Sequence, residues 1–440
     1  MAAATFRSLQ ELRDCVARLG AVRIVAKLLS ENDNVKQQIY LGGGFESLNV
    51  LPYGEVTEDR RPKTPNLKAP IRLHWLSDGG AAEPATHAQL ILYTGYPEVR
   101  LSGFVRGCAA APSQLLQPVP RAERRFDNEP DGRVLLMGVA EDGRVMAYLA
   151  SAGSGVAREF RAAADRGAFL RSGALLEARL DAPRAADAKA ELLRRLSEFR
   201  AAGWHWSRRL QHGIPIPYNA RNGGGYTLEA LFGISPNGES APDFLGWEIK
   251  AYGSDRVTLM TPEPNGGYYG KHGVEAFLRK YGRRLPDDVI YFTGAHKAGQ
   301  VCTTTGQTLR LRGYEPGATR FDALGHIELI DRAENVSAAW SFAKLLEHWG
   351  RKHAQAAYVA CDSRSGPPRE YAYGTPVLLG ESTDFLKFLS AVSERAVYYD
   401  PGPKLERAST RQKKVHPRSQ FRIRVSGLPR LYASFTAVSI

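Results

Sequence analysis

The sequence predicts two or three domains, with a β-rich N-terminal part followed by a mixed α/β C-terminal part. The chain has 440 residues, more than one small hydrophobic core can organise. Its composition, 43% hydrophobic and 10% aromatic, is that of a folded protein rather than a disordered one. Short β-prone runs separated by turn residues fill the first third of the chain, and stretches rich in Ala, Arg, Glu and Leu follow them.

The chain is strongly basic, with a formal net charge of +13 and a pI near 9.5. This charge favours an anionic partner, nucleic acid first and a membrane surface second, although proteins that bind neither also carry solvated basic faces. The four cysteines are scattered and form no CxxC pair, so we expect neither a zinc site nor a disulfide framework. No signal-peptide core and no bilayer-spanning apolar run is present, so we expect a cytoplasmic location.

The N-terminal part is expected to begin with a helix and to continue as a barrel or sandwich of short strands. Apolar residues recur at helical spacing over residues 8–19, where Ser8 is a suitable N-cap and Glu11 occupies the third helical position. Seven β-like runs follow, at residues 22–29, 38–41, 71–76, 88–93, 98–104, 134–139 and 145–149. Residues 141–144, Glu-Asp-Gly-Arg, predict a tight hairpin turn between the last two runs.

Two segments of this part, residues 30–38 and 96–106, carry polar side chains suited to contact DNA. Asn and Gln can pair with adenine edges, and Arg can pair with guanine edges. Ordinary polar loops have a similar composition, so the residues alone leave both interpretations open.

The same region resembles the effector domain of the EcoRII restriction enzyme, which is a β pseudobarrel. The similar pieces are residues 26–33, 39–41 and 100–107. The resemblance implies an EcoRII-N-like pseudobarrel that clamps DNA in the major groove between two arms. The DNA-binding residues implied for these arms are Lys27, Ser30, Asn32, Asp33, Lys36, Gln38, Arg100 and Arg106.

Strand signals disappear after residue 155, and helices are expected over Ala157–Arg166, Ala174–Leu180 and Ala186–Ala202. Pro183 interrupts this region, so we place a domain junction near it. We therefore divide the chain into an N-terminal domain (1–155), a helical linker (156–187) and a C-terminal domain (188–440).

The C-terminal part is organised around residues 243–250, Asp-Phe-Leu-Gly-Trp-Glu-Ile-Lys. Residues 246–251 predict a short buried strand on which Glu248 and Lys250 share one face, while Trp247 and Ile249 share the other. Asp243 lies at a bend that can bring its carboxylate beside Glu248. Two carboxylates with open positions suit Mg²⁺, and a neighbouring Lys can stabilise a pentavalent phosphate or the attacking water. Taken alone, the pattern also fits an edge strand with a surface Glu–Lys pair.

Two further features precede this strand. Residues 223–225 are three consecutive glycines, which let the backbone approach a phosphate or simply form a turn. Residues 226–232 predict a short helix that carries Glu229, a third carboxylate placed to reach the same metal or its water.

Three motifs together resemble the MvaI/BcnI restriction endonucleases, which are relatives of the mismatch-repair nickase MutH. The motifs are Gly-Trp-His at 203–205, Gly-Gly-Gly-Tyr-Thr-Leu-Glu-Ala-Leu at 223–231 and Pro-Asp-Phe-x-x-x-Glu-Ile-Lys at 242–250. The resemblance extends over roughly residues 190–435 and implies a restriction-endonuclease-like α/β fold of the PD-(D/E)XK type. It further implies that Asp243 and Glu248 hold Mg²⁺, that Lys250 orients or activates the attacking water, and that Glu229 supports the metal site. Ala251 departs from the Thr of many relatives, which puts no catalytic group in doubt.

A basic stretch at residues 391–424 mixes Arg and Lys with Tyr, His and Phe. Its prolines disfavour a helix, so we expect a β-ribbon or long loop able to enter the major groove, where Arg reads guanine. In the resembled family the corresponding ribbon reads the bases. That resemblance carries base reading onto Arg395, Tyr399 and Arg422, and more loosely, because of an apparent insertion, onto His416 and Arg418.

The remaining C-terminal segments are expected to be structural: strands at 308–311, 326–330 and 356–362, and a helix at 337–349. Together the observations predict a Mg²⁺-dependent type II restriction endonuclease that acts as a monomer by sequential nicking, with double-stranded DNA as its partner. The resemblance suggests the target CCWGG and a second DNA copy bound by the N-terminal domain. The alternatives are a MutH-like nicking repair endonuclease and a sequence-specific DNA-binding protein with an inactive nuclease fold.

Overall fold

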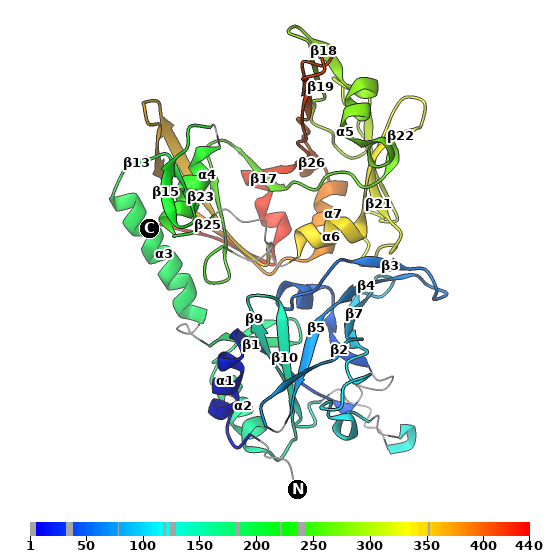
Figure 1. Ribbon diagram of the computed structural model, residues 1–440, viewed down its shortest axis with the longest axis vertical. Helices are drawn as coiled ribbons and strands as arrows, with labels where there is room; N and C mark the ends of the chain where they lie inside the picture. Colours follow the sequence, from blue (N-terminus) through cyan, green and yellow to red (C-terminus); the bar gives the residue numbers. More distant parts are fainter. Residues whose placement is uncertain are drawn as a thin grey trace. The chain divides into compact units, whose positions relative to one another are not determined.

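The computed structural model describes residues 6–31, 38–77, 79–117, 120–123, 129–180, 185–220, 222–235, 243–350 and 353–440. The chain separates into two compact units, Met1–Glu191 and Leu192–Ile440, and each is described by itself (Figure 1). Over the described ranges, no helix has both the length and the apolar character needed to cross a membrane.

The N-terminal unit contains two β-sheets. The first has seven strands in the order β11-β12-β1-β9-β10-β5-β6, and only the β10–β5 pair is parallel. Its strands are β1 (Ala21–Leu28), β5 (Arg72–Leu76), β6 (Ala82–Pro84), β9 (Val134–Ala140), β10 (Arg144–Ala150), β11 (Leu170–Ser172) and β12 (Leu175–Arg179). The second is antiparallel, in the order β2-β8-β7-β4-β3. Its strands are β2 (Gln38–Gly43), β3 (Thr57–Asp59), β4 (Asn66–Pro70), β7 (Gln89–Tyr93) and β8 (Glu98–Ser102). Neither sheet closes on itself within the described ranges, so a barrel is not established.

Two helices cover the first sheet: α1 (Leu9–Arg18) and α2 (Gly155–Asp165). The predicted cap of α1 is confirmed, because Ser8 Oγ accepts a hydrogen bond from Glu11 N at 3.1 Å. Leu12 and Val16 of α1 and Phe160 of α2 are buried in one core with the inner face of the sheet. Short 3₁₀ turns complete the unit: η2 (Glu46–Asn49), η3 (Ser113–Leu116) and η4 (Arg121–Glu123).

The prediction of a helix at Ala174–Leu180 is wrong, because most of this segment forms β12. β12 pairs antiparallel with β1, with Ala26 opposite Leu176, and Leu175 and Leu176 are buried. The open edge of β1 supplies a hydrogen-bonding partner, which outweighs the helical propensity of Ala, Leu and Glu. The segment predicted as a helical linker, 156–187, therefore contributes strands to the N-terminal sheet, and Pro183 lies outside the described residues.

The C-terminal unit is built on a mixed sheet in the order β13-β24-β23-β25-β30, with β16 added parallel to β23. Its strands are β13 (His205–Trp206), β16 (Glu248–Tyr252), β23 (Gln355–Arg364), β24 (Glu370–Tyr373), β25 (Val377–Glu381) and β30 (Ser434–Val438). Helices α3 (Ala185–Ala201) and α4 (Gly223–Leu231) cover one face of this sheet. Leu192, Leu196 and Leu228 from these helices share a core with Trp247 and Ile249.

Smaller sheets surround this one: β14-β15, β17-β29-β26, β18-β19-β27-β28 and β20-β21-β22. Their strands are β14 (Arg208–Gln211), β15 (Ile214–Pro217), β17 (Arg256–Met260), β18 (Arg283–Leu285), β19 (Val289–Tyr291), β20 (Thr308–Arg312), β21 (His326–Ile330), β22 (Val336–Ser341), β26 (Val397–Tyr399), β27 (Lys404–Glu406), β28 (Lys414–His416) and β29 (Phe421–Arg424). The helices are α5 (Gly267–Tyr281), α6 (Phe342–Trp349), α7 (Phe385–Ser393) and the 3₁₀ turn η6 (Val425–Leu431). The predicted helix at 337–349 is wrong in its first turn, since residues up to Ser341 pair with β21.

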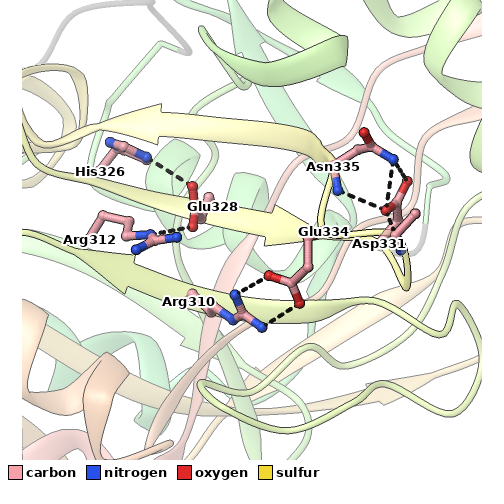
Figure 2. A network of polar contacts seen from close by, with 8 residues as sticks. Arg310, Arg312, His326, Glu328, Asp331, Glu334 and Asn335 are labelled. Atoms are coloured by element: carbon pink, nitrogen blue, oxygen red, sulfur yellow. Dashed lines mark hydrogen bonds and ion pairs between the residues drawn. The ribbon is translucent and has the colours of Figure 1, made fainter.

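The β20–β21 pair carries a network of charged side chains on one face (Figure 2). Arg312 Nε donates to Glu328 Oε1 at 2.9 Å, and His326 Nε2 lies 3.0 Å from Glu328 Oε2. Glu328 is buried, whereas the neighbouring pair between Arg310 and Glu334 is exposed. The apolar residues Leu309, Ile327 and Leu329 are buried in the core, so the alternation of the strands fixes which residues face solvent.

Candidate active site

The turn that leads into β16 brings Asp243 back to the start of the strand. Phe244 and Trp247 exchange both backbone hydrogen bonds, at 2.9 and 2.8 Å, around the two central residues Leu245 and Gly246. Both central residues have positive φ, 48° and 90°, which is the geometry of a type I′ turn. Asp243 Oδ2 then accepts a hydrogen bond from Ile249 N at 2.9 Å. The bend expected from the sequence is therefore present, and it holds this carboxylate beside β16.

Glu248 and Lys250 lie on one face of β16, opposite Trp247 and Ile249. Lys250 Nζ donates to Glu248 Oε1 at 2.8 Å, and the two side chains are only 16% and 5% exposed. Burial alone would lower the pKa of Lys250, but the adjacent Glu248 carboxylate, with Tyr358 and Asp243, outweighs it and raises that pKa. Lys250 is therefore held as a cation, suited to stabilise negative charge rather than to accept a proton.

These side chains open into a cleft of ≈ 990 Å³. Its walls come from α4, β16, β17 and the end of β23, and they include Glu229, Glu248, Lys250 and Arg422. Three of the four predicted catalytic residues thus share one cavity, and Asp243 stands outside its lining.

The cleft also contains residues that the sequence analysis missed. His353 lines it, with Nδ1 3.0 Å from Trp349 O and Nε2 3.0 Å from Leu259 O. Burial, helped by the positive charge of Lys250, lowers the pKa of His353 to about 4. Next to Lys250 on β23 lies Tyr358, whose hydroxyl is 2.8 Å from that of Tyr432. Nothing in the local sequence signals these residues, because Tyr358 reaches Lys250 through the parallel β16–β23 pairing and His353 reaches the cleft through its contact with Leu259 of β17.

The glycines that open α4 serve close packing. A Cβ atom at Gly223 would lie 2.8 Å from Tyr371 Oη, and one at Gly224 would lie 2.9 Å from Cys361 Sγ. Gly225 faces open space and lines the cleft. Close approach to the sheet therefore accounts for the first two glycines, a role different from the phosphate approach and the turn expected from the sequence.

Comparisons with known proteins bear on this site. Residues 193–432 match the MvaI/BcnI restriction endonuclease family. The chain belongs to the MvaI/BcnI restriction endonuclease family. Two solved structures are also similar. "Restriction endonuclease MvaI-cognate DNA substrate complex" has 18% identity over 56% of this chain and 97% of that chain, with a TM-score of 0.43. "Restriction endonuclease MvaI in the absence of DNA" has 16% identity over 58% and 100%, with a TM-score of 0.33. No curated protein matches the sequence.

Membership of the MvaI/BcnI family makes the chain a site-specific DNA endonuclease, in agreement with the prediction. Its candidate metal ligands are hard oxygen donors, the kind that Mg²⁺ prefers. Among the described residues, no group of three or more His, Cys, Asp or Glu side chains forms a ready cation site. Two carboxylates, Asp243 and Glu248, suit a Mg²⁺ ion that keeps several waters and takes phosphate oxygens as further ligands.

The predicted base-reading residues of this endonuclease are only partly accessible. Arg422 lines the cleft and donates to Asp400 Oδ2 at 2.8 Å, and Arg395 and Arg418 are exposed. His416 is half-buried, with Nε2 3.1 Å from Glu406 Oε2. The prediction that Tyr399 reads bases is corrected, because this residue is 2% exposed and packs on Trp340 and Phe421 in the core. An aromatic residue on β26 is needed there to fill the interior, so Tyr399 does not face a ligand.

The predicted DNA-contacting residues of the N-terminal unit differ in how exposed their side chains are. Lys27 and Ser30 are buried, and Lys27 Nζ donates to Leu28 O at 3.1 Å, so they are corrected from surface contacts to interior residues. The structure places Gln38 and Arg100 half-buried on the adjacent strands β2 and β8, and Arg106 exposed beyond β8. Asn32, Asp33 and Lys36 lie outside the described residues.

Proposed function

We propose that this chain is a Mg²⁺-dependent type II restriction endonuclease whose active site is the cleft around Glu248. The observation that supports this assignment most strongly is the shared position of Glu229, Glu248 and Lys250 in one cavity of a restriction-endonuclease family member. A cleft of ≈ 990 Å³ is open enough to admit a phosphodiester with its neighbouring sugars.

In this proposal Asp243 and Glu248 would hold Mg²⁺, which when bound would neutralise charge on the scissile phosphate. The Lys250 ammonium stabilises the charge that develops on the phosphoryl oxygens, and it orients the attacking water by hydrogen bonding. Glu229, across the cleft on α4, accepts a hydrogen bond from that water or its neighbours. The new water O–P bond forms in line as the P–O3′ bond breaks. The attacking water gives up a proton to solvent as its oxygen bonds to phosphorus, and O3′ takes up a proton from solvent as it leaves, so the products are a 5′-phosphate and a 3′-hydroxyl.

A pair of matched variants tests this site. Asp243→Asn should lower the cleavage rate about 10³-fold at saturating Mg²⁺ while DNA binding in Ca²⁺ stays intact, because it removes one metal ligand. Asp287→Asn, which makes the same substitution at an exposed position beyond β18, should leave cleavage unchanged. Equal cleavage by the two variants would exclude Asp243 as a metal ligand, and an inactive wild type would favour a DNA-binding protein.

For the whole chain, we propose recognition of CCWGG, sequential nicking by a monomer, and binding of a second DNA copy by an EcoRII-like N-terminal domain. The combination resembles the layout of the monomeric restriction enzyme UbaLAI. The support for it is the match of the family to the C-terminal unit alone and the exposed Arg106 beyond β8. Sequencing the ends of digested phage DNA tests the target, and any consensus other than CCWGG would contradict it.

A further inference from the structure

A basic hairpin stands beside the cleft and has no role in the catalysis described above. We call it the arginine hairpin, residues 206–218. It consists of β14 and β15, with Gln211 paired to Ile214 across the two-residue turn His212-Gly213. Both turn residues have positive φ, 51° and 77°, so the turn is tight and of type I′.

The arginine hairpin is fixed to a wall of the cleft. A two-stranded sheet is marginally stable alone, and this one is anchored on α4 through the buried Thr227. Thr227 Oγ1 accepts a hydrogen bond from Arg208 N at 3.1 Å and donates one to Arg208 O at 3.3 Å. The same helix supplies Tyr226 and Glu229 to the cleft lining. The hairpin therefore keeps a fixed position relative to the catalytic residues.

Two guanidinium groups of this hairpin rest on aromatic rings. Arg208 Cζ lies 4.9 Å from the centre of the Trp206 ring, and Arg209 Cζ lies 5.4 Å from that of Tyr218. Tyr218 in turn meets Tyr226 of the cleft wall, with ring centroids 4.9 Å apart. Such stacking orients a guanidinium while leaving its N–H groups available.

Neither arginine forms an ion pair with a carboxylate anywhere in the described ranges, although Arg310, Arg312 and Arg422 of the same unit do. Both side chains are half-buried, so water solvates them only in part. A partly desolvated cation without an acidic partner is costly, and a phosphate oxygen would offset that cost. The tip adds Ile214, an apolar side chain that is 65% exposed.

We propose that the arginine hairpin is a phosphate clamp, in which Arg208 and Arg209, which project from opposite faces of β14, each bind a phosphate of the DNA backbone beside the cleft. The proposal rests on the Glu248 cleft as the place where DNA is cut. It makes the two arginines positioning residues: they hold the backbone in register and touch neither the metal nor the reacting atoms. Such contacts add affinity without sequence information.

The test is steady-state cleavage of a one-site duplex by full-length Arg209→Gln and by Arg208→Gln/Arg209→Gln, at 50–200 mM salt (about a fourfold range). We expect KM to rise about tenfold for the single variant while kcat is unchanged. The slope of log(kcat/KM) against log[salt] should become shallower by about 0.9 per arginine removed. Arg209→Lys keeps the charge and should restore the slope.

The control is Arg194→Gln, which removes the same charge from an arginine that pairs with Glu198 on α3 and should leave KM and the salt slope unchanged. An unchanged KM in both hairpin variants, with circular dichroism like the wild type, would overturn the clamp. A loss confined to cognate DNA, with noncognate binding intact, would also overturn it, because it would indicate base reading. Unchanged cleavage by Asp243→Asn, together with a raised KM in the hairpin variants, would contradict the proposed metal site and leave the clamp standing, so the two failures are distinguishable.

Discussion

The protonation of His353 is subject to two opposing influences: its two carbonyl contacts favour the protonated ring, whereas burial and the charge of Lys250 favour the neutral ring. Its two ring nitrogens face the carbonyl oxygens of Trp349 and Leu259, so a neutral ring can donate to only one of them. Burial and the charge of Lys250 nevertheless lower its pKa to about 4. The neutral ring is the form that we expect at pH 7, which leaves a buried carbonyl facing a nitrogen lone pair. Stability in this part of the unit should therefore depend on pH.

The direction of this pH dependence follows from whether the folded or the unfolded chain binds the His353 proton more tightly. The folded pKa lies below the unfolded value of about 6.5, so the unfolded chain binds the proton first as pH falls. The free energy of unfolding should decrease by about 3 kcal/mol between pH 6.5 and pH 4, relative to a His353→Asn variant. Urea unfolding followed by tryptophan fluorescence measures this, since every tryptophan except Trp75 lies in the C-terminal unit. If the wild type gains stability over the variant on acidification, the native ring is an imidazolium.

At the scale of elements, the β20–β21 pair offers an internal comparison between two arginines on one strand. Removing Arg312 leaves the buried Glu328 carboxylate with His326 alone, whereas removing Arg310 leaves Glu334, which is 66% exposed (Figure 2). Arg312→Ala should lower the free energy of unfolding by about 2 kcal/mol, and Arg310→Ala should lower it by clearly less. Urea denaturation of both variants tests this, and equal losses of unfolding free energy would show that the burial of Glu328 does not increase the cost of removing its arginine partner.

The turn before β16 provides a second prediction at this scale. Leu245 adopts φ 48°, a conformation in which a branched apolar residue is strained, and Gly246 follows with φ 90°. Leu245→Asn should raise the free energy of unfolding by about 1 kcal/mol, because Asn-Gly is the preferred pair for this turn. Gly246→Ala, the matched opposite, should lower it. A thermal melt that moves the same way for both variants would contradict the turn assignment.

Local patterns predict the elements that depend on local chemistry and miss those that depend on distant pairing. The cap of α1, the hairpin turn at 141–144 and the strand around Glu248 follow from residues within a few positions of each other, and the structure contains all three. β12 was expected to be helical from its own residues, because its partner strand β1 lies about 150 residues earlier and gives no local signal of the pairing. Tyr399 was expected to read bases because it lies in the basic stretch 391–424, and its core partner Trp340 lies outside that stretch.

At the scale of the whole molecule, the chain consists of two compact units, and the endonuclease family matches only the second. The first unit has its own core and two sheets, so it is a folded body rather than an extension of the nuclease. The first unit is close to neutral, with 25 Lys and Arg against 23 Asp and Glu over residues 1–191, so a DNA surface on it would depend on local groups such as Arg106 rather than on net charge.

This reasoning leads to a test on DNA with one or two recognition sites. If the N-terminal unit binds a second copy, a plasmid with two sites should be cleaved at least tenfold faster than one with a single site, since a tethered site has a high effective concentration. A short cognate duplex added in trans should accelerate cleavage of the one-site plasmid. Arg106→Ala, at an exposed position beyond β8, should reduce this stimulation, whereas Arg171→Ala, an exposed arginine on β11, should not. Equal rates on both plasmids at every enzyme concentration would remove the effector role and leave the first unit as a structural partner of the nuclease.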